Sequence, residues 1–203
     1  MSSSREHILY ALAKNQPPLA PLPLLPVVDA AGTNLQEKFT QTAINIGSSV
    51  HVVKDYQQVE NILKQQFTKT RRVVSRIEKS RIFSGENQQL PLDPHALEAV
   101  DLAILQGQLG VAENSSIWIE EDLLGARVLP FICQHLALII RQKEIVASMH
   151  QAYEIIAEKD YGYGVFIAGP SKTADIEQSL VLGAHGPRSL SVFILVEEQE
   201  KDY

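Results

Sequence analysis

Cysteine is nearly absent from this chain, since Cys133 is the single thiol among 203 residues. One thiol cannot close an intrachain disulfide, and it cannot supply the set of thiolates that a cysteine-ligated zinc site or an iron–sulfur cluster requires. The six histidines show no HxxH or HExxH spacing. We therefore predict no metal and no cofactor, and we expect Cys133, which stands in the apolar stretch PFICQHLAL, to be a core residue.

Long hydrophobic runs and an excess of basic charge are also missing. No uncharged apolar run approaches the ~20 residues that span a bilayer, and the first fifteen residues hold no apolar segment of signal-peptide length. The 24 acidic residues outnumber the 18 basic ones, which gives a net charge of -6. This balance argues against a non-specific nucleic-acid binder and against electrostatic attachment to membranes. The sequence predicts a cytoplasmic protein without a membrane span.

The first 33 residues form a separate arm in this interpretation. Ser3 and Glu6 have the spacing of a capping box, and an apolar stripe at helical spacing follows them, which predicts a short helix. Five prolines then fall between positions 17 and 26, alternating with leucines. Such a segment favours an extended path but is too apolar for a solvated linker. The arm therefore packs either on its own domain or on a partner subunit, which could be a second copy of the chain in a homo-oligomer.

Residues 34–203 read as one α/β domain, in which strands and helices alternate along the chain. The expected helices cover 35–46, 59–67, 143–157 and 174–183, and the expected strands cover 48–55, 71–77, 101–107, 115–121, 127–133, 136–141, 164–169 and 189–198. This order predicts a mostly parallel sheet flanked by helices, with the helix-poor middle as an antiparallel excursion.

The segment GPSKTADIE joins the end of a predicted strand to the start of a predicted helix. Ligands of open parallel sheets bind beyond the carboxyl ends of strands, and the free amides of a helix start attract anions. Gly169 and Pro170 would make the turn, Ser171 or Thr173 would cap the helix, and Lys172 would add a positive charge. We predict a site for a small carboxylate or phosphate here. The alternative is a capped helix that binds nothing.

Two further turns carry polar side chains. In AHGPR, His185 is a candidate base or anion ligand, or else a hydrogen-bonded turn histidine, and Arg188 is a candidate cation. In AENSS, Glu113 and Asn114 are held between two apolar stretches, although a turn also needs such residues for its own backbone. These positions extend the list of candidate ligand-binding residues.

The whole run GPSKTADIEQSLVLGAHGPR resembles the signature of the lactate-utilisation C, or LUD-domain, family. Four other segments resemble comparable pieces of that family more loosely: SREHILYAL, GVAENSSIWI, RVLPFIC and KEIVASMHQAYEII. The resemblance implies a fold like that of ribose-phosphate isomerase, glucosamine-phosphate deaminase and CoA transferases. It also implies membership of a bacterial system that oxidises L-lactate to pyruvate, in which the other two subunits are iron–sulfur proteins.

One departure from the family pattern concerns Ser115. Many relatives have alanine–glutamate–threonine–glycine where this chain has Ala-Glu-Asn-Ser from position 112 to 115. The glycine that could adopt a positive φ is thus replaced by a residue that adopts it less easily. Glu113 carries over directly from the family pattern, whereas the glycine at position 115 does not.

The predicted site joins the Glu113 turn to the loop 171–173, with His185 and Arg188 nearby. In this hypothesis the loop binds a carboxylate or phosphate, the cations neutralise it, and Glu113 transfers a proton. The family resemblance does not settle whether this chain is itself an enzyme. Two other functions stay open: a stand-alone isomerase or acyl-transfer enzyme acting on a sugar phosphate or CoA ester, and a noncatalytic assembly subunit that binds the iron–sulfur partners.

Overall fold

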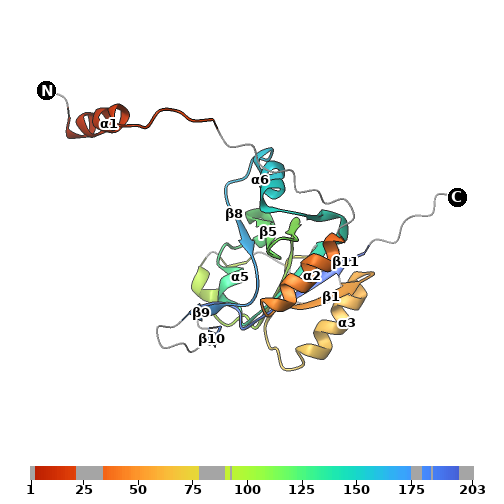
Figure 1. The fold of residues 1–203 in the computed structure, drawn as a ribbon. Helices are drawn as coiled ribbons and strands as arrows, with labels where there is room; N and C mark the ends of the chain where they lie inside the picture. The colour runs from red at the N-terminus through yellow and green to blue at the C-terminus, as the bar shows by residue number, and fades with distance from the viewer. Residues whose placement is uncertain are drawn as a thin grey trace.

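The computed structural model describes residues 3–21, 34–77, 90–91, 93–174, 180–183 and 185–196, with 173–174 and 180–182 described by their backbone. Its centre is a five-stranded parallel sheet (Figure 1). The strands lie in the order β1 (Ser49–Val53), β11 (Ser189–Leu195), β6 (His135–Arg141), β3 (Leu102–Gln106) and β2 (Val73–Ser75). The predicted mostly parallel α/β sheet is confirmed.

The central strand β6 shows why this sheet has a core on both faces. Leu136, Leu138 and Ile140 pack into one hydrophobic cluster, and Ala137 and Ile139 pack into another on the opposite face. Successive side chains of a strand point to opposite faces, so a continuous apolar run fits a strand that is covered on both sides. This explains why the interior of the run HLALIIR is apolar throughout.

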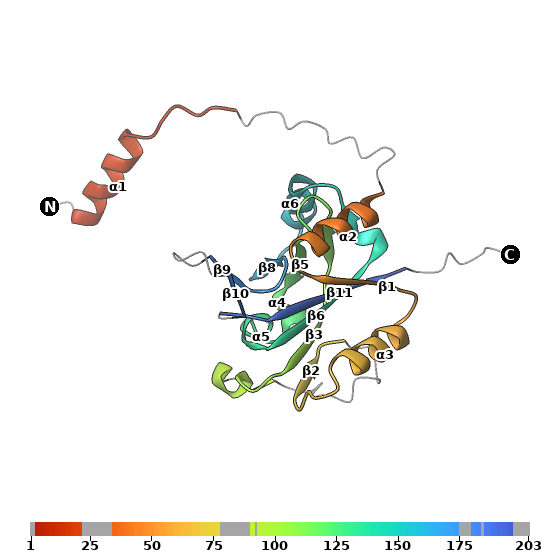
Figure 2. The same cartoon turned by 60° about the horizontal axis from the view of Figure 1, so that its bottom comes forward.

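Two helices cover the opposite faces (Figure 2). Helix α2 (Leu35–Asn45) buries Phe39 and Ala43 in the first cluster, and α3 (Tyr56–Gln66) buries Val59 and Leu63 in the second. Both helices begin at a side-chain cap, because Asn34 accepts a hydrogen bond from the amide of Glu37 and Asp55 accepts one from Gln58. The helices predicted over 35–46 and 59–67 are therefore confirmed, with α3 starting three residues earlier.

A second, four-stranded sheet packs against the first. Its order is β7 (Ile145–Val146), β4 (Leu109–Val111), β5 (Ile117–Glu120) and β8 (Gly164–Ile167). Strands β4 and β5 are antiparallel, which confirms the antiparallel excursion. Ile117 and Ile119 of β5 face the main core. Trp118 points to the opposite face of this sheet, where it is buried against α6 (Met149–Ala157). The helix predicted over 143–157 thus begins later, after the short 3-10 turn η2 (Gln142–Glu144) and β7.

The strand predicted over 127–133 is wrong. After α4 (Glu121–Leu124) the chain forms a second short helix, α5 (Leu129–Ile132), with Pro130 in its first turn. Proline has no amide hydrogen to give to a sheet, but a first helical turn leaves that amide unpaired in any case. Another short 3-10 turn, η1 (Pro94–Leu97), precedes β3.

The helix predicted over 174–183 is also wrong at both of its ends. Lys172–Ala174 form β9 and Leu180–Leu182 form β10, and the two strands pair antiparallel. Residues 175–179 lie outside the described part of the chain. Branched residues such as Thr173 and Val181, which pair in this hairpin, favour strands over helices.

The amino-terminal helix α1 (Ser4–Lys14) begins at the predicted capping box. The Ser3 hydroxyl accepts a hydrogen bond from the amide of Glu6, and the Glu6 carboxylate accepts one from the amide of Ser3 at 2.8 Å. In Figures 1 and 2 the helix lies apart from both sheets, and every described residue of the arm, 3–21, is exposed. Residues 22–33, which hold the rest of the arm, lie outside the described part. Among the helices that the structure describes, none is long and apolar enough to cross a bilayer.

Candidate functional site

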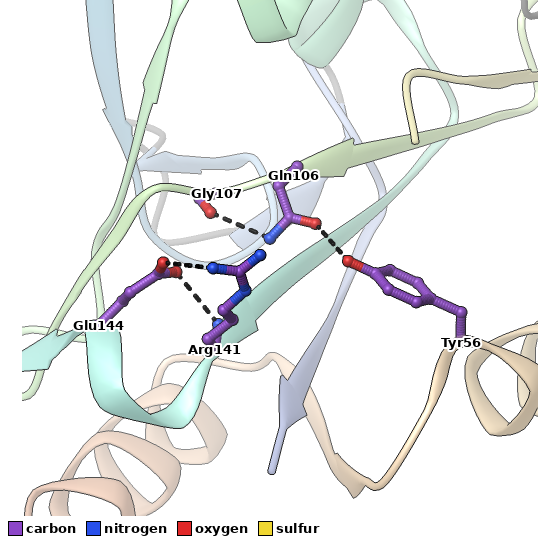
Figure 3. Close-up of polar contacts among 5 residues, drawn as sticks. All are labelled: Tyr56, Gln106, Gly107, Arg141 and Glu144. Atoms are coloured by element: carbon purple, nitrogen blue, oxygen red, sulfur yellow. Dashed lines mark hydrogen bonds and ion pairs between the residues drawn. The ribbon is translucent and has the colours of Figure 1, made fainter. Parts of the chain in front are cut away.

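A cavity of about 310 Å³ opens at the carboxyl ends of the parallel strands. Strand β3 ends there at Gln106, β6 ends there at Arg141, and Tyr56 begins α3 shortly after β1. The described lining consists of Tyr56, Arg76, Ile77, Gln106, Gly107, Gln108, Leu123, Arg141, Glu144 and Lys159. Parallel sheets of this kind bind their ligands at this edge. We therefore take this cavity as the candidate site (Figure 3).

Arg141 and Glu144 form the charged pair of the site (Figure 3). The Arg141 Nη1 lies 3.5 Å from Oε1 of Glu144, and the amide of Arg141 donates to Oε2 of the same carboxylate at 3.4 Å. The tight turn η2 makes this possible, because it brings the carboxylate back over the last residue of β6. About a third of each side chain is exposed, 36% and 27% respectively. The pair is thus oriented by the fold and remains accessible to a ligand.

Tyr56 and Gln106 form a second polar contact beside this pair (Figure 3). The Tyr56 hydroxyl donates to Oε1 of Gln106 at 3.2 Å, and Nε2 of Gln106 donates to the carbonyl of Gly107 at 3.3 Å. Gly107, directly after β3, packs closely against Ile117 and Ile140. This close packing requires glycine, because a Cβ at position 107 would collide with both isoleucine side chains. These bonds fix a hydroxyl and an amide at the mouth of the site.

Arg76 adds a buried donor that has no partner in the described part of the chain. It follows β2, and its amide donates to the carbonyl of Ile104 at 2.9 Å. Its side chain packs under Gly125, where a Cβ would lie 2.6 Å from Nε. Among the described residues, this Nε finds no hydrogen-bond acceptor. A buried donor left unpaired costs free energy, so an anionic ligand near this guanidinium would remove part of that cost.

Lys159 is partly neutralised at the far side of the cavity. Its Nζ lies 3.2 Å from Oε1 of Glu120. Burial alone would raise the pKa of Glu120, but hydrogen bonding to Gln108, Lys159 and Trp118 outweighs burial and holds this pKa below its ordinary value. The carboxylate is therefore ionised at neutral pH and retains the lysine. Arg76 and Arg141 are the two guanidinium groups of the described lining.

The described residues offer little support for metal or thiol chemistry. No group of three or more His, Cys, Asp or Glu side chains among them is placed to hold a metal ion. Cys133 is only 1% exposed, and burial raises the pKa of its thiol to about 12. A protonated, buried thiol is a poor nucleophile. Cys133 is thus the core residue that its apolar context predicts.

The Glu113 turn connects β4 to β5 and caps a helix. Oε2 of Glu113 accepts a hydrogen bond from the amide of Met149, the first residue of α6, at 3.0 Å. Oδ1 of Asn114 accepts from the amide and the hydroxyl of Ser116, at 3.0 and 2.7 Å. Ser115 adopts a φ of 57°, so it takes the left-handed conformation that glycine adopts most easily. The side chains of Glu113 and Asn114 thus both accept hydrogen bonds from backbone amides, as a turn requires, and their role in ligand binding stays a prediction.

The loop at Ser171 and the AHGPR turn lie side by side, as the prediction required. The amide of Ser171 donates to the carbonyl of Pro187 at 2.9 Å, and the amide of Gly183 donates to the carbonyl of Ser171 at 3.0 Å. The helix-capping role of Ser171 and Thr173 is wrong, however, because Lys172–Ala174 are a strand. Residues 172–174 therefore do not form the helix start at which the anion site was predicted. His185 is exposed, and the Thr173 side chain lies outside the described part of the structure.

Both predicted segments contact the carboxyl-terminal half of α2. The hydroxyl of Thr42 lies 3.5 Å from the carbonyl of Ala112, at the start of the Glu113 turn. Gly169, at a φ of 71°, packs closely against Ile46, and the Lys172 side chain runs beside Gly47. The two segments thus flank the same helix end. The eight predicted residues, none of which belongs to the described lining of the carboxyl-end cavity, are Glu113, Asn114, Gly169, Ser171, Lys172, Thr173, His185 and Arg188.

The sequence did contain a signal for part of the cavity. Gln106 and Arg141 are the polar residues that end the predicted strands DLAILQG and LALIIR. Applying the rule that ligands bind at the carboxyl ends of parallel strands to every strand, and not only to GVFIAG, would have found both residues. Arg76 and Lys159 carry no comparable local signal.

Comparison with known proteins gives consistent matches. A family model described as LUD domain matches residues 36–195. Lactate utilization protein C of Anoxybacillus flavithermus is 30% identical over 103 residues, which are 50% of this chain and 47% of that protein. Lactate utilization protein C 1 of Bacillus mycoides is 31% identical over 108 residues, which are 50% of this chain and 46% of that protein. The matches thus span about half the length of these relatives.

The fold also matches a solved structure. A DUF162 family protein from Deinococcus radiodurans superposes with a TM-score of 0.63 at 18% sequence identity, over 84% of this chain and 99% of that chain. At this identity the likeness shows the fold alone. The family model, in contrast, covers well over half of the chain. This chain therefore belongs to the LUD-domain family.

Proposed function

We propose that this chain is a component of a lactate-utilisation system and that it binds a small carboxylate in the cavity at the carboxyl ends of β3 and β6. The relatives named lactate utilization protein C support the pathway. The observation that carries the location is the buried Nε of Arg76, which has no acceptor among the described residues and lies in a cavity that Arg141 also lines. Guanidinium groups suit carboxylates because their parallel N–H donors match the two oxygens.

The neighbouring polar groups suit the rest of a 2-hydroxy or 2-oxo acid. The Tyr56 hydroxyl and the Gln106 amide stand beside Arg141 and could exchange their mutual hydrogen bond for one to the ligand's second oxygen (Figure 3). Lactate and pyruvate each carry one carboxylate and one such oxygen. Glu144 is the only carboxylate in the described lining, so it is the group best placed to accept a proton.

Oxidation of lactate to pyruvate removes two electrons and two protons, which an electron acceptor must take up. A chain with a single cysteine cannot build a four-thiolate cluster. In this proposal the acceptor is a cluster-containing partner protein, and the present chain binds the acid. Conversion of L-lactate would then require mixing this chain with such partners, and turnover by the isolated chain would contradict this division of labour.

A second candidate function, the noncatalytic assembly subunit, is favoured by one observation. Helix α1 exposes Ile8, Leu9 and Leu12 by 61%, 49% and 60%. An apolar helix face of this kind is typical of a surface that binds another protein. The two functions are compatible, because α1 and the cavity involve different residues.

Calorimetric titration with L-lactate and pyruvate tests the binding proposal. Arg141→Gln and Arg76→Gln should each weaken binding by roughly 1.5 to 3 kcal/mol, the usual contribution of a hydrogen bond to a charged group. Arg5→Gln, on the exposed helix α1, removes the same charge far from the cavity and should leave the affinity unchanged. If Lys172→Ala weakens binding while Arg141→Gln does not, the ligand binds at the loop 171–173 and the proposed location is wrong.

A further inference from the structure

A second cavity, of about 610 Å³, lies at the opposite edge of the parallel sheet. His135 is the first residue of β6, Asp101 directly precedes β3, and Arg188 directly precedes β11. The cavity therefore opens at the amino ends of these strands. Its described lining consists of Arg71, Arg72, Glu98, Ala99, Asp101, Gln134, His135 and Arg188. None of these residues lines the carboxyl-end cavity.

Three guanidinium groups line this cavity against two carboxylates, and one of the carboxylates is already engaged. Oδ2 of Asp101 accepts hydrogen bonds from the amide of Arg71 at 2.7 Å and from the amide of Arg72 at 3.0 Å. These amides, that of Arg72 first, hold the pKa of Asp101 below its ordinary value. The carboxylate thus fixes the backbone that carries the two arginines. With three guanidinium charges and two carboxylate charges, the described lining carries an excess of one positive charge.

Arg71 and Arg188 approach the cavity from different segments, one before β2 and one before β11. Neither guanidinium makes a hydrogen bond or ion pair with a described residue. Their backbones are held, since the amide of Arg188 donates to the carbonyl of Gln134 at 2.8 Å and that of Arg71 donates to Asp101. The two side chains are therefore anchored at the base while their charged ends remain open to a ligand.

The ring of His135 is held in place in the lining of this cavity. Its Nδ1 lies 2.7 Å from the hydroxyl of Ser189, and the ring packs against that of Phe67 with centroids 4.8 Å apart. Burial, together with the charge of Arg188, lowers the pKa of His135. The imidazole is thus neutral at pH 7, and the positive charge of the cavity comes from its arginines.

We propose that the cavity at the amino ends of β2, β3, β6 and β11 binds a small molecule through a phosphoryl group, either a phosphate monoester or a diphosphate. One guanidinium satisfies the two oxygens of a carboxylate, whereas a phosphoryl dianion offers three oxygens and a second charge, which suit arginines from two segments. The cavity has about twice the volume of the carboxyl-end cavity, 610 against 310 Å³. This site is separate from the proposed lactate site and makes the chain a two-ligand protein.

Calorimetric titration of the full chain at low salt tests this site, with inorganic pyrophosphate as the probe and sulfate as a competing dianion. Pyrophosphate should bind more tightly than sulfate. Arg71→Gln and Arg188→Gln should each weaken pyrophosphate binding about tenfold or more. Arg188→Lys, which keeps the charge but loses the guanidinium fork, should weaken it less. Arg5→Gln and Arg141→Gln, which remove the same charge elsewhere, should leave the pyrophosphate affinity unchanged.

Several results would overturn the proposal. These are the absence of pyrophosphate binding at millimolar concentration, equal affinity for sulfate, or an equal loss of affinity in Arg5→Gln. Thermal melts check folding, and Arg71→Lys with Arg188→Lys replace the glutamine variants if those do not fold. The lactate proposal stands or falls on Arg141→Gln, so the two failures are distinguishable.

Discussion

His135 and Arg141 are the first and last residues of the same strand, β6, and each lines a different cavity. At the usual rise of a parallel strand, about 3.3 Å per residue, they stand ~20 Å apart. The five residues between them are all buried in the two cores. The two edges of the sheet are thus joined by a rigid, well-packed element, and a ligand at one edge has a fixed spatial relation to a ligand at the other.

Asp101 should make stability depend on pH in the acid range. Its folded-state pKa is lowered, chiefly by the amides of Arg72 and Arg71, so its contribution is fully present above its unfolded pKa of about 4 and is lost as pH falls through the folded value. Asp101→Asn should therefore reduce the free energy of unfolding at pH 7, by less than about 1 kcal/mol because the group is well solvated.

Urea denaturation of parent and variant at pH 7, 5, 4 and 3 measures this effect. The difference between the two proteins should be constant from pH 7 to 5 and should shrink below about pH 4, where the carboxylate of the unfolded parent becomes protonated first. A difference that stays constant to pH 3 would show that the charge of Asp101 is not what stabilises the segment around Arg71.

Gly169 and Ser115 both have a positive φ, so replacing the glycine by alanine and the serine by glycine tests the cost of that backbone conformation from both directions. Gly169 has a φ of 71°, and a Cβ there would lie 3.3 Å from the carbonyl oxygen of Ile46. Gly169→Ala should lower the free energy of unfolding by about 1 to 3 kcal/mol. Ser115 has a φ of 57°. Ser115→Gly should change stability by less than about 0.5 kcal/mol, because relief of strain offsets the lost hydroxyl. Thermal or urea melts compare the two, and equal effects would contradict this explanation.

The sheet and its helices could be predicted because their signals are local. The apolar run of β6 and the caps at Ser3, Asn34 and Asp55 each identify an element from a few adjacent residues. The hairpin β9–β10 was missed because its strands are only three residues long and are stabilised by pairing with each other. The apolar residues of ADIEQSLVLG also have a spacing typical of a helix, and this spacing led to the wrong prediction. Element type in such short segments is decided by tertiary partners.

The candidate site was harder to predict than the fold. Gln106 and Arg141 end recognisable strands, but their meeting with Arg76 and Lys159 depends on how the second sheet and α6 pack, which no local pattern encodes. The site was predicted in the segment 169–188 because glycine, proline and charged residues are concentrated there. In the structure the described residues of this segment form a hairpin and a turn, and the backbone of Ser171 is hydrogen-bonded to that of Pro187 and of Gly183.

Cys133 should be unreactive in the folded protein. The thiol is 1% exposed and its pKa is raised to about 12 by burial, so at pH 8 it is neither accessible nor ionised. Ellman's reagent at pH 8 should label less than about a tenth of the thiol in native protein over minutes, and all of it in 6 M guanidinium chloride. Rapid labelling of native protein with an intact thermal transition would place the thiol at the surface.

Removal of the described arm should leave the domain stable. Every residue from 3 to 21 is exposed, and α1 contributes no buried side chain to the described cores. Deleting residues 1–21 should therefore change the melting temperature by less than about 2 °C, since a surface change without buried contacts alters stability by less than about 0.5 kcal/mol.

If the exposed Ile8, Leu9 and Leu12 bind another subunit, the deletion should lower the oligomeric mass in sedimentation or abolish binding to a partner. Ile8→Gln with Leu12→Gln should reproduce that loss in the full chain, whereas Arg5→Gln on the same helix should not. Loss of the cooperative melt on deletion would instead show that the arm packs on its own domain in solution.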